Sequence, residues 1–309
     1  MASIDLRCGD ATEQFRALSD ESVDLIIADP PYNLGKDYGN NHDLKGFDDY
    51  IAFTKAWLSE AKRVLKPHGT IYVFMGVRFI SYLYDIMDRD LKLYFNSWVV
   101  WHYTQGLGKT KGFSPRHDDI LVFNKGKDFI FNLDDVRVPQ KYYRERNNMR
   151  GANPGDVWTF SHVHYSNPNR QDHPTQKPEG IIERVVLASS NKGDLVLDPF
   201  SGSGTTLRVC QQLDRNVIGF ELNPAYVEAT KSRLAEPFNG FDSVDPRMER
   251  VPNDLTNEEI REQYFRNHIA WFLKNHENAL EVFKRAVQDK YGEDITKYAA
   301  EETRQSSLF

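Results

Sequence analysis

Four consecutive residues, Asp29, Pro30, Pro31 and Tyr32, offer the groups needed to hold an aminated planar ring. The Asp29 carboxylate and the Pro30 carbonyl can lie side by side as two acceptors for the N–H groups of an amine. Each proline fixes φ near about −65°, so the backbone is stiff here. Tyr32 offers a flat face for stacking, which is worth about 1–3 kcal/mol per base. Taken alone, the stretch is explained equally well by a strand that ends in Asp-Pro and by a core tyrosine.

The apolar residues 23–28 that precede Asp29 predict a buried strand, and the two prolines end it because they cannot donate to a ladder. Open α/β sheets bind their ligands beyond the carboxyl ends of such strands. We therefore expect Asp29 to Tyr32 to lie at the ligand-binding edge of a sheet.

A second stretch has the composition of a nucleoside site. A predicted strand over residues 194–197 runs into a glycine-rich turn and a predicted helix over 205–213, whose free N–H groups suit a carboxylate or a phosphate. Glu221 follows the next predicted strand, 216–220, where an acid suits a ribose diol. The residues of this stretch are Asp198, Phe200, Gly202, Ser203, Gly204, Thr205, Thr206 and Glu221.

The spacing of these glycines favours S-adenosylmethionine as the ligand. It does not match G-x-G-x-x-G, so a nicotinamide cofactor is the second choice, and the G-K-[ST] of a phosphate loop is absent. The methionine carboxylate can lie at the helix N-terminus and the ribose at Glu221. The sulfonium can rest near an aromatic face, that of Phe200 or Tyr32.

The elements that position these residues alternate along the chain. Apolar spacing predicts helices over residues 50–65 and 79–87 and strands over 70–75 and 97–103. Near the start, a predicted strand turns at Gly9 and Asp10 into a helix over 11–18. Asp10 is either a ligand contact or the N-cap of that helix. The alternation predicts an α/β fold with a doubly wound, mostly parallel, Rossmann-like sheet.

Composition and charge narrow the class of protein. The 309 residues carry a net charge of −6, so a nucleic-acid surface must be local. Only two cysteines are present, without metal-ligand spacing, and no apolar run is long enough to span a bilayer. We expect a cytoplasmic protein with no metal and no membrane contact.

Residues 104–170 break the alternation and are locally basic. Residues 101–150 hold ten Lys or Arg against six acids, with tyrosines between the cations. This pattern is typical of phosphate and base contacts, and a solvated polar insertion is the alternative. Strands are predicted over 119–124 and 129–132. The cations proposed for these contacts are Lys109, Lys111, Arg116, Lys141, Arg144, Arg146 and Arg150.

With both stretches in view, residues 1–235 resemble the amino-methyltransferases of DNA, specifically the beta class, in which D-P-P-Y precedes D-P-F-x-G-S-G-T-T. The resemblance extends to H-P-T-Q-K-P at 173–178, V-L-K-P-H-G at 64–69 and the Gly-Asp pair at 9–10. It implies S-adenosylmethionine as cofactor and double-stranded DNA as partner. It also implies that Asp29, Pro30, Pro31 and Tyr32 are catalytic, and that Lys177 faces the cofactor or caps a helix. The implied cofactor residues are Asp10, Asp29, His173, Thr175, Lys177, Asp198, Phe200, Gly202, Ser203, Gly204, Thr205, Thr206, Glu221 and Asn223.

The resemblance also implies a division of the chain. Residues 1–103 would form the catalytic half of the methyltransferase domain and residues 171–238 the cofactor-binding half, with residues 104–170 between them as the target-recognition insertion. Residues 239–309 lie outside the resemblance. Apolar spacing there predicts a helical C-terminal extension of two helices, with a capping box at Thr256 and Glu259. Its ten Lys or Arg against fourteen acids favour docking or a subunit contact over a DNA clamp.

Chemistry of this kind requires base flipping, because a methyl donor cannot reach an exocyclic amine inside a duplex. A carboxylate is too weak a base to deprotonate the neutral amine, so Asp29 and the Pro30 carbonyl are expected to orient its lone pair toward the methyl group. Asp at the first motif position favours adenine N6, with cytosine N4 as the alternative. RNA or protein methylation and a catalytically inactive DNA-binding relative are further alternatives. A cognate restriction endonuclease and a homodimer stay open as partners.

Overall fold

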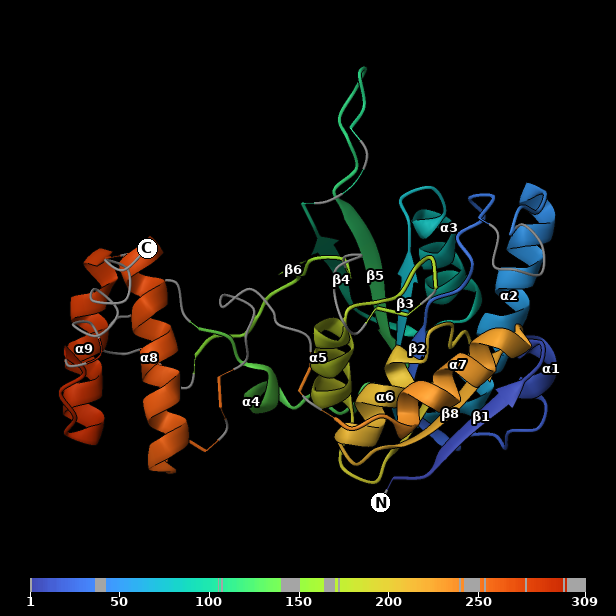
Figure 1. Cartoon of the computed structure of the whole chain (residues 1–309). Coiled ribbons are helices and arrows are strands. Elements are labelled where there is room, and N and C mark those ends of the chain that lie inside the picture. Colours follow the sequence, from blue (N-terminus) through green and yellow to red (C-terminus); the bar gives the residue numbers. More distant parts are fainter. Residues whose placement is uncertain are drawn as a thin grey trace. The chain divides into compact units, whose positions relative to one another are not determined.

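The computed structural model describes part of the chain, and its contacts divide the chain into two compact units. The first unit comprises residues 1–132 and 156–243, and the second comprises 133–155 and 244–309. Each is described by itself (Figure 1). The described residues are 2–36, 43–104, 106, 108–139, 151–163, 170–171, 173–238, 240–241, 251–252, 254–275, 277–296 and 298.

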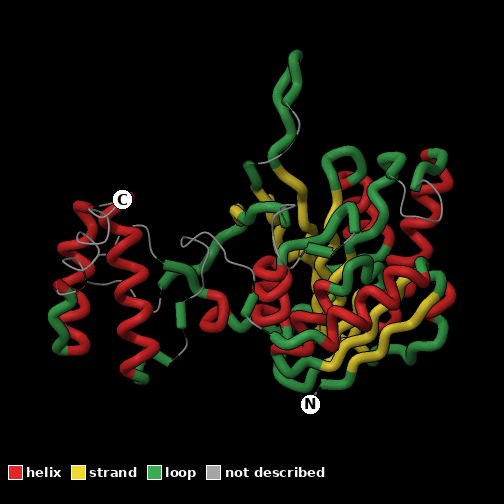
Figure 2. The backbone as a smooth tube through the Cα atoms, viewed as in Figure 1, coloured by secondary structure: helices red, strands yellow, loops and turns green. Residues whose placement is uncertain are grey.

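An eight-stranded sheet forms the centre of the first unit (Figure 2), in the order β1-β8-β7-β2-β3-β5-β4-β6. Neighbouring strands run parallel except where β5 pairs antiparallel with β3 and β4. The predicted α/β fold with a mostly parallel sheet is therefore confirmed. The strands are β1 (Ile4–Cys8), β2 (Val23–Ala28), β3 (Leu65–Met75), β4 (Tyr94–His102), β5 (His117–Asn124), β6 (Val157–Thr159), β7 (Leu195–Asp198) and β8 (Asn216–Glu221).

The central strands carry apolar side chains on both faces of the sheet, and helices cover both faces. Ile71 and Val73 of β3 pack in a core cluster with Trp57 of α2. Tyr72 points the other way, and its hydroxyl bonds the Ser189 hydroxyl of α5 at 2.8 Å. The helices of this unit are α1 (Ala11–Phe15), α2 (Phe47–Val64), α3 (Ile80–Asp85), the π-helical turn η1 (Ile86–Asp90), α5 (Glu179–Ser189), α6 (Thr205–Gln212) and α7 (Pro224–Ala235).

One local prediction is wrong, one predicted helix is divided into two elements, and Asp10 takes one of its two expected roles. Residues 129–132 form no strand, because Asn132 instead donates to the Leu187 and Ser190 carbonyls at the end of α5. The predicted helix over 79–87 is two elements, α3 and η1. Asp10 is the N-cap of α1, with its side chain accepting from the Thr12 N–H at 2.8 Å.

The second unit contains α4 (Leu133–Val136) and the two helices predicted for the C-terminal extension, α8 (Glu258–Asn275) and α9 (Glu277–Tyr291). Phe265, Phe283 and Val287 are fully buried in their common core. The predicted capping box is wrong: Asn257 caps α8 by accepting from the Ile260 N–H at 3.2 Å, and the Thr256 hydroxyl is taken by Asp254. Among the described residues, no helix is long and apolar enough to cross a bilayer.

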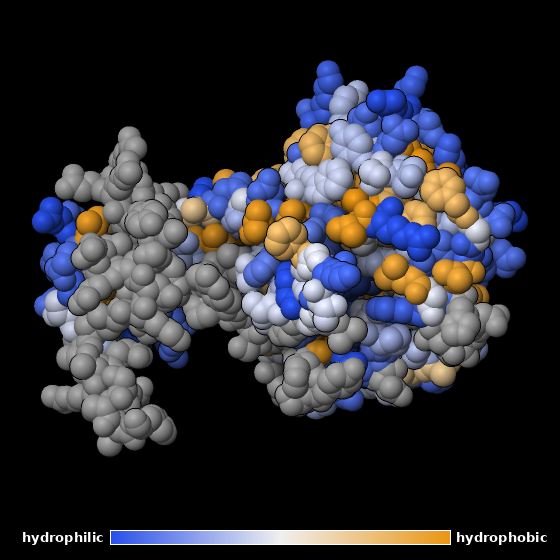
Figure 3. Space-filling model, turned by 90° about the horizontal axis from the view of Figure 1, so that it is seen from above, coloured by the Kyte–Doolittle hydropathy of each residue, from blue (hydrophilic) through white to orange (hydrophobic). Residues whose placement is uncertain are grey.

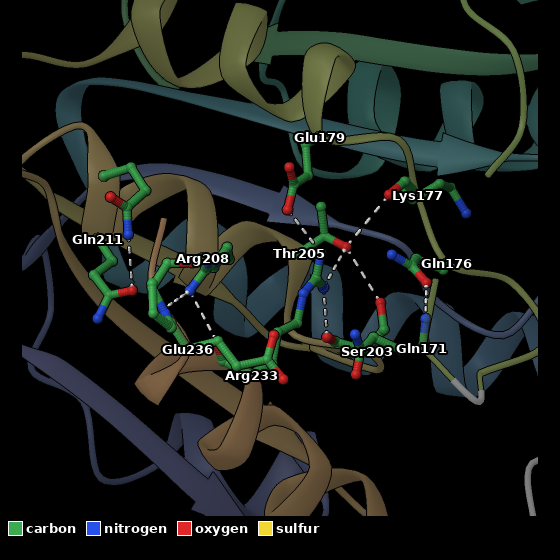
Figure 4. Close-up of polar contacts among 12 residues, drawn as sticks. Gln171, Gln176, Lys177, Glu179, Ser203, Thr205, Arg208, Gln211, Arg233 and Glu236 are labelled. Carbon is green, nitrogen blue, oxygen red and sulfur yellow. Dashed lines mark hydrogen bonds and ion pairs between the residues drawn. The ribbon is translucent and has the colours of Figure 1, made fainter. Parts of the chain in front are cut away.

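A buried ion pair connects α5 and α7, and its arginine also contacts the glycine-rich turn (Figure 4). Arg233 of α7 meets Glu179, the first residue of α5, at 2.8 Å, and the two side chains are 3% and 4% exposed. Arg233 also donates to the Ser203 carbonyl at 2.8 Å and to the Thr205 hydroxyl at 3.2 Å. One guanidinium therefore holds α5, α7 and the turn before α6 in register.

We expect Arg233→Met to destabilise the protein strongly, because it leaves the Glu179 carboxylate buried without its cation. Breaking such a pair costs about 3–5 kcal/mol. Denaturant unfolding measures the loss. Lys231→Met on the same helix is the control, since that lysine pairs with Glu228 on an exposed surface and its loss should cost less than about 1 kcal/mol. Similar costs for the two variants would contradict this role.

Candidate active site

A cavity of about 650 Å³ lies where β2 and β7 end, and it brings together the two stretches identified in the sequence. Asp29 to Tyr32 form part of its wall, and Phe200 to Ser203 form another part. The view from above in Figure 3 looks onto this edge of the sheet, where hydrophobic and hydrophilic side chains are mixed. The cavity thus combines apolar walls with a small set of polar groups, as small-molecule sites do.

The two carboxylate oxygens of Asp29 have different environments. Oδ2 accepts a hydrogen bond from the ammonium group of Lys177, which is 148 residues away in the sequence. Oδ1 is buried and, among the described residues, has no hydrogen-bond partner. A buried carboxylate oxygen without a donor is unfavourable. The site therefore holds one charged acceptor ready for a donor from a ligand.

Aromatic rings surround the ammonium group that binds this carboxylate. The Lys177 ammonium lies 5.4 Å from the ring centroid of Tyr32, 5.5 Å from that of Phe74 and 5.9 Å from that of Trp101. The Tyr50 hydroxyl donates to the Pro31 carbonyl at 2.8 Å, which fixes the backbone behind the Pro-Pro pair. Flat apolar faces next to a hydrogen-bond acceptor form a suitable site for an aminated heterocycle.

The glycine-rich turn requires its glycines. Gly202 and Gly204 have φ of +49° and +72°, which side chains rarely adopt. A Cβ on Gly202 would lie 2.9 Å from Nε2 of His173, and one on Gly204 would overlap the Thr230 side chain. The backbone of the turn packs so closely against its neighbours that no side chain fits at either position.

Glu221 is fixed by this turn and by the start of α7. Its Oε2 accepts from the Gly202 N–H at 2.8 Å, and its Oε1 accepts from the Asn223 N–H at 2.8 Å. Burial raises the pKa of the Glu221 carboxyl. The carboxylate retains acceptor capacity for a ligand hydroxyl, which suits the diol predicted for this position.

Burial also shifts the pKa values of two other groups in the wall. Burial raises the pKa of Asp198 to about 7, although its carboxylate accepts from the Phe200 N–H at 3.0 Å. Burial lowers the pKa of His173 to about 4, so its imidazole is neutral near pH 7. The His173 Nδ1 accepts from the Thr175 N–H at 3.3 Å, and the ring packs edge-on against Tyr226.

Most of the predicted site residues line the cavity. Gly204 and Asn223 do not: Gly204 shapes the turn, and Asn223 caps α7 by accepting from the Ala225 N–H at 2.9 Å. The predicted residues in the wall are Asp10, Asp29, Pro30, Pro31, Tyr32, His173, Thr175, Lys177, Asp198, Phe200, Gly202, Ser203, Thr205, Thr206 and Glu221.

Sequence reasoning missed the wall made by β3, β4 and β5. Phe74, Trp101 and Asp118 contribute to the cavity from the ends of these strands, and His162 follows β6. Burial raises the pKa of Asp118. Their position in the sequence could have indicated them, because each lies within a few residues of the end of a strand at the ligand-binding edge of the sheet.

The predicted DNA contacts divide into two groups. Lys109 and Lys111 are exposed in the segment that joins β4 to β5, and Arg116 at its end is half-buried. Lys141, Arg144, Arg146 and Arg150 lie outside the described residues. Within the described parts of the chain, no group of His, Cys, Asp and Glu side chains has the geometry of a metal site.

Known proteins resemble this chain over most of its length. The profile of a family described as DNA methylase matches residues 23–232. The type II methyltransferase M.HpaI of Haemophilus parainfluenzae is 60% identical over 293 residues, 94% of this chain and 93% of that protein. The DNA adenine methyltransferase YhdJ of Escherichia coli (strain K12) is 36% identical over 239 residues, 73% of this chain and 81% of that protein.

Solved structures share the fold. The cytosine-N4-specific PvuII DNA methyltransferase has a TM-score of 0.63 at 18% identity, covering 87% of this chain and 93% of that one. The M1.HpyAVI-SAM complex has a TM-score of 0.56 at 24% identity, covering 75% of this chain and 100% of that one. At these identities the structures support the fold alone, whereas the match of the family profile and the identity to M.HpaI establish descent. The chain belongs to the N6/N4 family of DNA amino-methyltransferases.

Proposed function

We propose that this protein transfers a methyl group from S-adenosylmethionine to the N6 amino group of an adenine flipped out of double-stranded DNA. The observation that carries the proposal is the buried Oδ1 of Asp29, which has no hydrogen-bond partner among the described residues, in a side chain that lines the same cavity as Tyr32. An exocyclic amine supplies the N–H that this oxygen lacks. The family membership supports a DNA base as its source.

The other half of the cavity fits the cofactor. Glu221 has acceptor capacity for the ribose diol, and Gly202 and Ser203 line the cavity near the start of α6. Phe200, which packs edge-on against Trp57, presents an aromatic wall. S-adenosylmethionine bound here supplies an activated methyl group on a sulfonium. The SAM complex of a protein with this fold agrees with the assignment.

Asp29 acts by orientation and charge. Its Oδ1 and the Pro30 carbonyl accept the two N–H groups of the target amine, so the nitrogen lone pair points at the methyl group. The carboxylate stabilises the positive charge that develops on nitrogen during in-line transfer, and a proton leaves afterwards. Lys177, bound to Oδ2, holds the carboxylate in position at the wall of the cavity.

Adenine is favoured over cytosine as the target. Aspartate as the first residue of the D-P-P-Y motif favours adenine in the family, and a relative named as an adenine methyltransferase is 36% identical. Cytosine N4 is the second candidate, because the fold is shared with a cytosine-N4-specific enzyme. The identity to a type II methyltransferase supports a role beside a restriction endonuclease that cleaves the same sequence.

Mass spectrometry of nucleosides tests the proposal. Unmethylated DNA is incubated with the purified protein and S-adenosylmethionine and then digested. We expect N6-methyladenine. N4-methylcytosine would retain the mechanism and overturn the choice of base, and the absence of both products with bound cofactor would overturn the choice of DNA as substrate.

We expect Asp29→Ala to abolish methyl transfer while leaving cofactor affinity within about twofold, because it removes the acceptor for the target amine and none of the polar groups around Glu221. Single-turnover methylation measures the first effect and calorimetric titration with S-adenosylmethionine the second. Equal loss of both in a folded variant would contradict this division of the site.

Lys177→Met separates two roles for the lysine. If Lys177 positions Asp29, the rate of methyl transfer falls by about tenfold or more and cofactor affinity changes little, since the variant removes the cation at Oδ2 and keeps the contacts with the rings. Lys177→Arg keeps the charge and should retain more activity. A weakened affinity for S-adenosylmethionine at an unchanged rate would instead make Lys177 a cofactor ligand.

A further inference from the structure

The loop that joins β4 to β5 carries an aromatic side chain that the proposed chemistry has not used. β4 ends at His102 and β5 begins at His117, and the segment between them projects away from the sheet (Figure 1). Phe113, near the end of this loop, is 99% exposed. Burial of a phenylalanine side chain is favourable, so its full exposure leaves apolar surface that a partner can cover.

The described part of the loop stands clear of the rest of the protein. A Cβ built on Gly108 or on Gly112 would meet no atom within 4 Å. Gly112 has a φ of +82°, which turns the backbone directly before Phe113. The Lys109 N–H donates to the Ser114 hydroxyl at 2.8 Å and closes the tip of the loop. The ring is therefore presented by a closed turn rather than packed against the fold.

The charge of the loop identifies the kind of partner. Residues 104–116 contain Lys109, Lys111 and Arg116 and no acidic residue, although the whole chain has a net charge of −6. Each lysine or arginine that neutralises a phosphate releases counterions and strengthens binding. An exposed ring flanked by cations is complementary to a duplex, whose phosphates border stacked bases.

The base of the loop is joined to the active site. The Tyr103 N–H donates to the Arg116 carbonyl at 3.0 Å, and His102 pairs with His117 in the sheet. Trp101 and Asp118, the next pair along the two strands, line the cavity. Phe113 is four residues from His117, so it reaches at most about 13 Å beyond the strand end. The grooves of B-DNA are about 7.5–8.5 Å deep, so this reach is enough to bring the ring to the base stack from either groove.

We propose that Phe113 is a wedge that enters the base stack of duplex DNA beside the target base and stabilises the flipped-out state. Apolar side chains of architectural proteins enter base steps in this way, at a cost in unstacking that their contacts offset. Lys109 and Lys111 hold the loop on the phosphates on either side. The inference rests on the proposed function, since it concerns the same DNA and the same flipped base.

The test compares two duplexes that contain the methylation site mapped with the wild-type protein. One duplex is fully paired, and the other has an abasic position opposite the target base, which removes the pairing that flipping must break. Phe113→Ala should slow single-turnover methylation of the paired duplex by about tenfold, and that of the abasic duplex by less than about twofold. Phe113→Trp should restore most of the rate on the paired duplex.

Phe129→Ala is the matched control. Phe129 is a 40% exposed phenylalanine in the loop that follows the opposite end of β5, and its loss should leave both rates unchanged. Cofactor titration and thermal unfolding verify that Phe113→Ala is folded, as its full exposure predicts.

Three outcomes would overturn the wedge. The Phe113→Ala rate could equal that of the wild type on the paired duplex, or it could fall equally on both duplexes, which would make Phe113 a general DNA contact. Light scattering could instead show that Phe113→Ala dissociates a dimer of the wild-type protein, which would make the ring a subunit contact. Failure of the wild-type protein to methylate any DNA is a separate result, since it removes the proposed function and the wedge with it.

Discussion

The contact on which the site depends most is the buried pair of Arg233 and Glu179. A buried ion pair seldom stabilises a protein more than apolar residues of the same volume would, because both charges lose their hydration. Its use here is geometric. Arg233 donates to Glu179, to the Ser203 carbonyl and to the Thr205 hydroxyl, so three segments distant in sequence share one rigid donor group.

That geometry extends from the glycine-rich turn to the D-P-P-Y motif. Glu179 follows Lys177 by two residues, and the Thr205 hydroxyl donates to the Lys177 carbonyl at 3.3 Å. The backbone that carries Lys177 is therefore fixed on both sides, and the lysine side chain reaches Asp29. A chain of polar contacts thus joins α7 to the D-P-P-Y motif. The motifs at 29–32 and 198–206 form one site because the segment at 173–178 lies between them.

The sequence was sufficient for the parts of the site that follow from local rules. Apolar runs and prolines located the ends of β2 and β7, and with them Asp29 and Asp198. Predictions failed where tertiary contacts determine the local structure or bring distant residues together. The pattern at 129–132 resembles a strand, but Asn132 satisfies the last carbonyls of α5 and draws the segment out of the sheet. The aromatic wall could not be found because Phe74 and Trp101 meet only through the pairing of β3, β5 and β4.

The two halves of the proposed reaction place opposite demands on the fold. Methyl transfer requires rigid groups in a closed cavity, whereas flipping requires an exposed ring that can enter DNA. The protein meets both demands at a cost to its free state: the Asp29 Oδ1 is buried without a described donor, and Phe113 is left in water. In the proposed reaction each cost is removed by the same ligand, since a flipped base offers an N–H to the carboxylate and the gap it leaves can hold the ring. Under this proposal part of the affinity for DNA derives from interactions that the free protein lacks, and these form only when a base leaves the stack.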